Sequence, residues 1–197
     1  SVPGGSALDL SFAPGTTATW LPDVGALRLS GSSLVRTSSG ATTLNNAIKA
    51  SQAMTVEMWV SPTNLNAGER TLLQIAPIGN ATQNLAIVQN GTSLQVSLRT
   101  STTDAKGRPV MTAPGVLSSG LHQIVVTRRA NGVVEVYVDG AVVFTTVRGG
   151  TLSPWVAGQP FGFGNTIAKT SPRTGDVYHL SVYTTDLSAV RVAQNYL

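Results

Sequence analysis

Cysteine is absent from this 197-residue chain, so it can form no disulfide framework, no cysteine-based zinc site and no thiol nucleophile. Charged residues make up only 11% of the sequence, against roughly 25% in an ordinary soluble domain. No apolar run of about 18 residues occurs, which argues against membrane insertion. Residues 1–10 lack the parts of a signal peptide and an initiator Met, as expected of an excised or processed domain.

The positive charge is small and dispersed. The formal net charge is +4, from thirteen basic residues, ten of them Arg, against nine acidic residues. Arg128 and Arg129 are the only adjacent basic pair, whereas tracking a phosphate backbone needs a contiguous basic patch. A solvated, slightly basic surface is therefore expected, with no nucleic-acid partner.

Signatures of common catalytic sites are also missing. The sequence contains no G-x-S-x-G, no H-E-x-x-H, no P-loop and no G-x-G-x-x-G. His122 and His179 are the only histidines. A Ser-His-Asp triad can be drawn from either, and nothing in the spacing favours one.

What the sequence does contain is strand periodicity, clearest at 120–146. Three consecutive antiparallel strands are expected there, joined at Asn131-Gly132 and Asp139-Gly140, because these dipeptides suit type I′ hairpin turns. Alternation places one set of side chains inward, namely Ile124, Val126, Val134, Val136 and Val138. It places the other set outward, namely Gln123, Thr127, Glu135, Tyr137 and Asp139.

Similar patterns continue along the chain. A short helical turn is expected at the end, with Ser188 as N-cap and an inward stripe of Leu187, Val190, Ala193 and Leu197. The length suits a single domain over 1–197. Two longer segments, 100–120 with one short strand and 148–158, are expected to form exposed loops. Further strands are predicted at 8–12, 25–37, 53–62, 71–76, 84–89, 93–100 and 176–183, with a hairpin at Asn90-Gly91.

Five segments together resemble the laminin-G-like group of the concanavalin A-like lectin/glucanase superfamily. They are GALRLSG (25–31), AMTVEMWVSP (53–62), LHQIVVTRRANGVVEVYVDGAVV (121–143), FGFGN (161–165) and GDVYHLSVYTTDLSAVRVAQNY (175–196). The resemblance implies an all-β fold, an antiparallel two-sheet jelly-roll sandwich. It also implies a binding or adhesion module in a secreted, extracellular or cell-surface protein. It implies no particular ligand, because this fold hosts lectins, enzymes and structural modules alike.

The chain departs from that family in its penultimate strand. Tyr178-His179 stands where relatives often carry an Asp-Glu pair. Some relatives bind structural calcium near this strand and the first one, which makes Asp9 and Asp176 the candidate ligands here. Calcium prefers six to eight oxygens with several carboxylates. Two ordinary surface or capping aspartates are the alternative.

A glycosidase site has weak support. Retaining glycosidases need two carboxyl groups about 5 Å apart, and the glucanases of this fold carry E-x-D-x-x-E on one strand. That string is absent, and the only strand glutamates that might meet are Glu57 and Glu135. A solvated or Arg-paired strand Glu is the alternative for each.

Aromatic residues are the candidates for ligand contact, because sugars stack on Trp and Tyr beside polar groups. Trp59 and Tyr137 share the outward register of Glu57, whereas Trp20 and Trp155 are expected in loops. Trp155, beside Pro154, is the aromatic most expected at a loop surface. Trp59 packing beneath a loop is the alternative.

These observations predict a non-catalytic recognition module whose partner is a glycan or a cell-surface or matrix protein. A structural or protein-interaction module without a small ligand is the second hypothesis, and an unusual glycoside hydrolase is the third. Aromatic exposure separates the first two: a solvent-facing Trp in a polar groove favours glycan, and a flat apolar patch favours protein.

Overall fold

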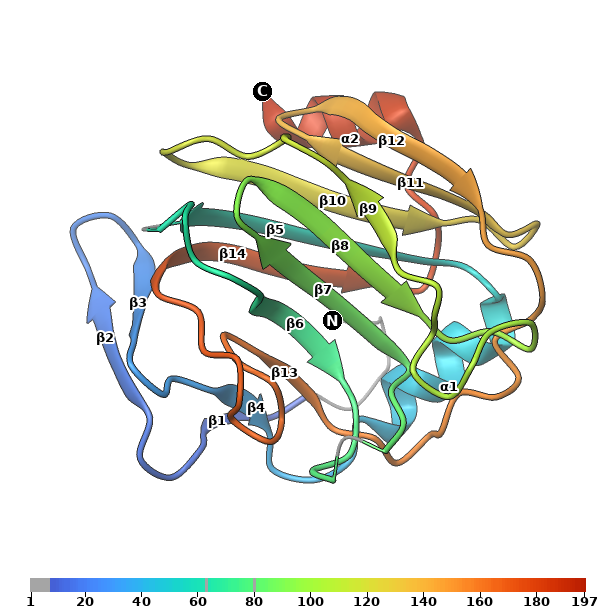
Figure 1. Ribbon diagram of the computed structural model, residues 1–197, viewed down its shortest axis with the longest axis horizontal. Coiled ribbons are helices and arrows are strands. Elements are labelled where there is room, and N and C mark those ends of the chain that lie inside the picture. The colour runs from blue at the N-terminus through green and yellow to red at the C-terminus, as the bar shows by residue number, and fades with distance from the viewer. Residues whose placement is uncertain (1–7, 63, 80) are drawn as a thin grey trace.

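The computed structural model describes residues 8–62, 64–79 and 81–197. Residues 1–7, which the single-domain prediction includes, lie outside the described part of the chain. The described residues form two seven-stranded antiparallel sheets packed face to face, which confirms the jelly-roll sandwich (Figure 1). The first sheet has the order β1 (Leu10–Phe12), β4 (Val35–Thr37), β13 (Phe161–Phe163), β6 (Arg70–Ile75), β7 (Leu85–Asn90), β8 (Ser93–Leu98), β9 (Met111–Ala113). The second has the order β12 (Ala141–Val147), β11 (Val133–Val138), β10 (His122–Arg128), β5 (Met54–Pro62), β14 (Gly175–Tyr183), β3 (Ala26–Ser30), β2 (Thr17–Leu21).

Alternating side chains from both sheets fill the space between them. In the second sheet Val126 of β10 pairs with Val56 of β5 on one side and with Val136 of β11 on the other. All three are buried in the main core, together with Met58 and Ile124. The predicted meander and its inward face are confirmed, because period-2 alternation fixes which face of a strand is apolar.

The hairpin turns differ from one another. Asp139 and Gly140 have φ of 52° and 76°, as a type I′ turn requires. At Asn131-Gly132 the predicted turn type is wrong, because only Gly132 has positive φ, at 90°, and its N–H donates to the Arg129 carbonyl at 2.9 Å. Glycine is needed there because a Cβ would lie 2.7 Å from the Arg148 carbonyl oxygen. The Asn90-Gly91 hairpin is likewise built on Gly91 alone, with φ of 60°.

Helix α1 (Thr42–Ser51) was not expected from the sequence and lies at one end of the two sheets (Figure 1). Its apolar residues Leu44 and Ile48 are spaced i, i+4, and Ile48 is buried in the core. Asn45, also buried, donates from Nδ2 to the Ala157 and Gln159 carbonyls at 2.8 and 2.9 Å. The signal was therefore a single i, i+4 pair in a polar segment, too weak to predict a helix.

Helix α2 (Ala189–Tyr196) begins where predicted, and the Ser188 side chain accepts the Arg191 N–H at 3.4 Å. The predicted inward stripe is wrong at Val190, which is 66% exposed, and at Leu197, which is fully exposed, whereas Leu187 does pack inward. Val192 is instead buried with Leu187 against the second sheet. The face of α2 that contacts the sheet is the one that carries Val192, one turn after Ser188. No helix in the described residues is long and apolar enough to cross a membrane.

Candidate functional site

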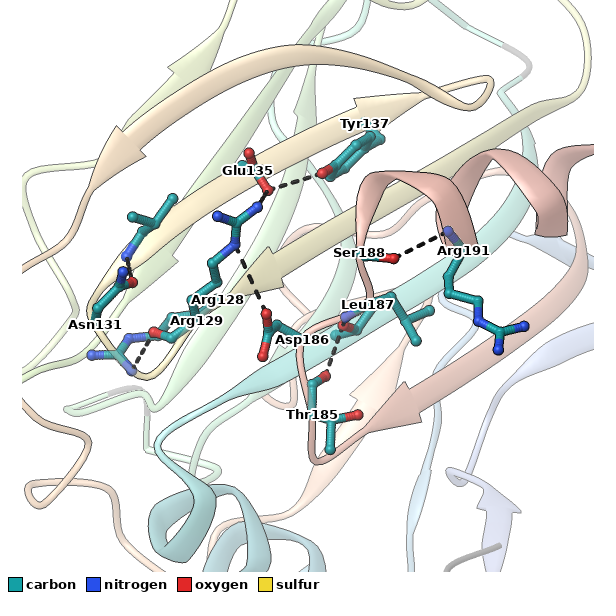
Figure 2. Close-up of polar contacts among 12 residues, drawn as sticks. Arg128, Arg129, Asn131, Glu135, Tyr137, Thr185, Asp186, Leu187, Ser188 and Arg191 are labelled. Carbon is teal, nitrogen blue, oxygen red and sulfur yellow. Dashed lines mark hydrogen bonds and ion pairs between the residues drawn. The ribbon is translucent and has the colours of Figure 1, made fainter.

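Part of the outer face of the second sheet, over β5, β10 and β11, is covered rather than solvated. The segment after β14, together with α2, lies over β5, β10 and β11, and Figure 2 shows polar contacts that hold it there. Arg129 contacts Glu135 on β11 at 2.9 Å and Asp186 in the covering segment at 3.8 Å. Thr55 Oγ1 donates to the Thr185 carbonyl at 2.8 Å. This cover decides which predicted site residues can reach a ligand.

Tyr137 does point outward as predicted, yet it is only 1% exposed because Val192 packs on it. Its hydroxyl donates to Glu135 Oε2 at 2.9 Å. Burial and then the neighbouring Glu135 carboxylate raise the pKa of Tyr137 to about 12. The exposure that a sugar-stacking Tyr137 would need is therefore absent.

Glu57 is the centre of a polar cluster beneath α2. It is 1% exposed, so the solvated strand Glu weighed from the sequence is wrong. Its Oε1 accepts from Gln123 Nε2 at 2.8 Å, and its Oε2 accepts from Asn195 Nδ2 at 2.9 Å and from the Tyr183 hydroxyl at 3.3 Å. Burial, then the Glu57 charge, raises the pKa of Tyr183. Glu57 thus joins β5, β10, β14 and α2 at one point.

Beside this cluster lies a shallow hollow of about 520 Å³, which we call the aromatic hollow. Trp59 is half-buried in its wall and stacks on Tyr196, with ring centroids 5.8 Å apart and an interplanar angle of 13°. The hollow is lined by Trp59, Tyr178, His179 and Tyr183, with Glu57 and Asn195. Rings beside amide and carboxylate groups are the chemistry that stacks on a sugar and binds its hydroxyls.

A β-bulge shapes the aromatic hollow. The register of β14 against β5 shifts between Val177 and His179, so that His179 pairs with Trp59 and Tyr178 is the extra residue. A bulge re-aims side chains locally, and here both residues line the hollow. Sequence reasoning found Trp59 and Glu57 but missed Tyr183 and Asn195, because only the fold brings α2 to β5.

The remaining two tryptophans lie elsewhere. Trp155 is 2% exposed, belongs to the main core and donates from Nε1 to the Arg99 carbonyl at 2.9 Å. Its predicted place at a loop surface is wrong, because the segment around it folds inward over the core. Trp20 is 61% exposed, but it lies on the edge strand β2 rather than in a loop.

The two calcium candidates lie apart, Asp176 on β14 of the second sheet and Asp9 just before β1 of the first. Asp176 on β14 holds Arg28 with both oxygens, at 2.8 Å each. The Arg28 hydrogen bonds, and then its charge, lower the pKa of Asp176. Asp9 precedes β1 and lines a separate hollow of about 150 Å³ together with Thr37 and Thr42. In the described part of the chain no three His, Cys, Asp or Glu side chains gather as a metal cluster.

Ser118, His122 and Asp139 form a triad-like row that the sequence spacing did not single out. His122 Nδ1 lies 2.7 Å from Asp139 Oδ2, and Nε2 lies 3.1 Å from Ser118 Oγ. Nε2 also accepts the Ser118 backbone N–H at 3.2 Å, and Asp139 Oδ1 accepts the Gln123 N–H at 3.0 Å. These bonds tie the turn before β10 to the β10–β11 hairpin, and we assign the row to holding that turn.

Glu57 and Glu135 do not form a carboxyl pair. They lie on β5 and β11 with β10 between them, and the register offsets them by two residues. Two strand spacings and two residues separate their Cα atoms by about 12 Å. Each carboxylate is also bound to different partners, Glu57 to Gln123 and Glu135 to Arg129. The arrangement does not match the approximately 5 Å separation of a retaining glycosidase.

A second hollow, of about 390 Å³, lies on the outer face of the first sheet. Its described lining is polar, including Gln74, Gln95 and Arg108, and contains no aromatic ring. The aromatic hollow therefore remains the better candidate for sugar stacking.

Comparison with known proteins places this geometry in a family. A laminin-G model, described as concanavalin A-like lectin/glucanases superfamily, matches residues 36–193. The chain belongs to this superfamily. No curated protein matches this chain in sequence.

Solved structures of the same fold include sugar-bound ones. The CBM40 domain of the Ruminococcus gnavus IT-sialidase bound to α2,3-sialyllactose has a TM-score of 0.67 and 14% identity to this chain. The match covers 87% of this chain and 95% of that chain. A botulinum neurotoxin type C structure, described as entering cells through two ganglioside molecules, has a TM-score of 0.68 and 11% identity, over 95% of this chain and 46% of that chain. A SAP-like pentraxin of Limulus polyphemus has a TM-score of 0.57 and 16% identity, over 74% of this chain and 70% of that chain. At these identities the likeness shows the fold alone.

Proposed function

We propose that this protein is a non-catalytic recognition module that binds glycan through the aromatic hollow. The observation that carries the proposal is Trp59, half-buried and braced by Tyr196, in a wall shared with Tyr178 and His179. A ring held by a second ring is pre-organised for stacking, which lowers the entropy lost on binding. The sialyllactose-bound domain of similar fold supports a carbohydrate ligand.

Replacing Trp59 by Ala is expected to weaken polysaccharide binding by about 1 to 3 kcal/mol without unfolding the domain. The measurement is affinity electrophoresis of the folded domain against a panel of neutral and acidic polysaccharides. Trp20→Ala is the matched control, since Trp20 is exposed on β2, outside the aromatic hollow, and it should leave retardation unchanged. If no polysaccharide retards the wild-type domain, glycan recognition is wrong.

A protein partner is the second candidate function. The observation in its favour is exposed apolar surface at the β2–β3 hairpin, where Trp20 is 61% and Val24 is 55% exposed. One structure of similar fold is a neurotoxin binding domain in complex with rat synaptotagmin II. Under this alternative Trp20→Ala, rather than Trp59→Ala, would weaken binding.

We place the module in a secreted or cell-surface protein, in keeping with its low charge and its surface of small polar residues. Absence of catalysis is part of the proposal. It is supported by the separation of Glu57 and Glu135 and by the carbohydrate-binding domains among the structures of similar fold. Hydrolysis of any polysaccharide in the panel would revive the glycosidase hypothesis.

Structural calcium stays a prediction, with Asp9 as its ligand, because Arg28 already occupies both oxygens of Asp176. If the site exists, millimolar Ca²⁺ should raise the melting temperature through binding to the folded state, and Asp9→Ala should remove that rise. Melting curves that coincide in Ca²⁺ and in chelator would rule it out.

A further inference from the structure

A third hollow, which we call the arginine pocket, lies where the segment leading into β14 meets the segment after β5. Its volume is about 300 Å³, and its lining includes Asn64, Arg70, Gln89 and Arg173. Two of these side chains are cationic, and no acidic residue is among its described lining. The arginine pocket is separate from the aromatic hollow, since the two share no lining residue.

Arg173 is buried without a hydrogen-bond partner. It is 1% exposed, and its Nε, Nη1 and Nη2 atoms make no hydrogen bond within the described residues. Asp176 attracts it electrostatically, but both oxygens of that carboxylate are held by Arg28. The fold therefore holds a buried cation whose guanidinium donors have no acceptor among the described residues.

The surrounding backbone keeps Arg173 in place. Its N–H donates to the Gly164 carbonyl at 2.8 Å. Two residues on, Gly175 has φ of 118° and passes so close to β5 that a Cβ there would lie 2.1 Å from the Ser61 oxygen and 3.4 Å from Arg173 Nη2. Burial lowers the pKa of Arg173 to about 10, which leaves it protonated at neutral pH.

The other polar groups of the pocket suit a sugar. Gln89 donates from Nε2 to the Asn64 and Gly91 carbonyls, at 3.3 and 3.1 Å. Its amide oxygen can therefore accept a hydrogen bond from a sugar hydroxyl. Arg70 donates from Nη1 to the Glu69 carbonyl at 2.9 Å and has further N–H groups. The site therefore combines cationic donors with an amide acceptor.

We propose that the arginine pocket binds the carboxylate of an acidic sugar, a uronic or a sialic acid, through Arg173 and Arg70. A guanidinium presents a planar fork of donors that matches a carboxylate. The carboxylate supplies a negative charge and the hydrogen-bond acceptors that the Arg173 guanidinium lacks. The sugar ring fills the remaining volume beside Asn64 and Gln89. This inference rests on the proposed glycan function and names the class of sugar.

The test is thermal unfolding of the domain in sodium N-acetylneuraminate and in sodium D-glucuronate, with sodium chloride at equal ionic strength as the reference. One carboxylate or both should raise the melting temperature saturably, by about 5 °C near 100 times its Kd. Arg173→Met should melt at or above the wild-type temperature without ligand, since it removes a buried cation whose donors have no acceptor among the described residues, and it should lose the carboxylate shift. Arg191→Met, on the exposed surface of α2, should keep the shift.

If the Met variant fails to fold, Arg173→Lys is the second variant to measure. A lysine keeps the charge but loses the planar fork of donors, so it should weaken binding of the acidic sugar at least tenfold. An equal shift in wild type and in the Arg173 variant would overturn the proposal. A shift with glucose 6-sulfate and with neither carboxylate would also overturn it. Polysaccharide binding that Trp59→Ala weakens, without any carboxylate shift, would overturn this inference and leave glycan recognition standing. The carboxylate shift should survive in Trp59→Ala.

Discussion

Replacing Glu57 by Ala is expected to lower the free energy of unfolding by about 3 to 5 kcal/mol. Glu57 is 1% exposed and accepts hydrogen bonds from Gln123, Tyr183 and Asn195. Truncation leaves the fully buried Gln123 amide and the half-buried Tyr183 hydroxyl without this acceptor, and unsatisfied buried groups cost more than the net value of the bonds lost. It also removes the hydrogen bond from Asn195 on α2 to Glu57 on β5.

The measurement is urea unfolding of the domain, with hydrogen exchange of α2 amides as a local readout. The chain's other two glutamates are matched controls. Glu135→Ala should cost about 1 kcal/mol, since it loses Arg129 and Tyr137 at a less buried site. Glu69→Ala, at an exposed position, should cost under about 0.5 kcal/mol. Equal effects of all three substitutions would contradict a buried anchor at Glu57.

Replacing Trp155 by Ala is expected to cost about 3 to 5 kcal/mol of stability, because a buried tryptophan leaves a large cavity. Trp155 is 2% exposed and also donates from Nε1 to the Arg99 carbonyl at 2.9 Å. Its loss should lower the urea midpoint far more than Trp20→Ala, where a side chain 61% exposed should cost less than about 1 kcal/mol. A small effect at Trp155 would mean that it lies at a loop surface after all.

These two residues show where sequence reasoning succeeds and where it stops. Alternation correctly placed Glu57, Trp59 and Tyr137 on the outer face of the second sheet. It carried no information on what covers that face, because the cover is α2, which lies more than a hundred residues from β5 in the sequence. Trp155 shows the same limit, since Pro and Gly neighbours signal a loop but not the direction in which the loop folds.

The candidate site divides in the same way. Trp59 and Glu57 were predictable, since an aromatic and a carboxylate on one strand face are visible in the residues. Tyr178 reaches the aromatic hollow through a bulge against β5, and Arg173 is buried by segments that the sequence gives no reason to bring together. Asp176 was predicted as a calcium ligand, yet Arg28 holds it from β3, 148 residues away.

The sequence by itself determined most of the strands, though not β2, and it determined the inward faces of β5, β10 and β11, the Asp139-Gly140 turn and the Ser188 cap. Each follows from residues within a few positions of one another, where backbone dihedrals and period-2 alternation act. The tertiary structure alone decided which outer faces are covered, which aromatics reach solvent and which charges are paired. Burial and ion pairing depend on contacts between distant segments, and local patterning does not encode those contacts.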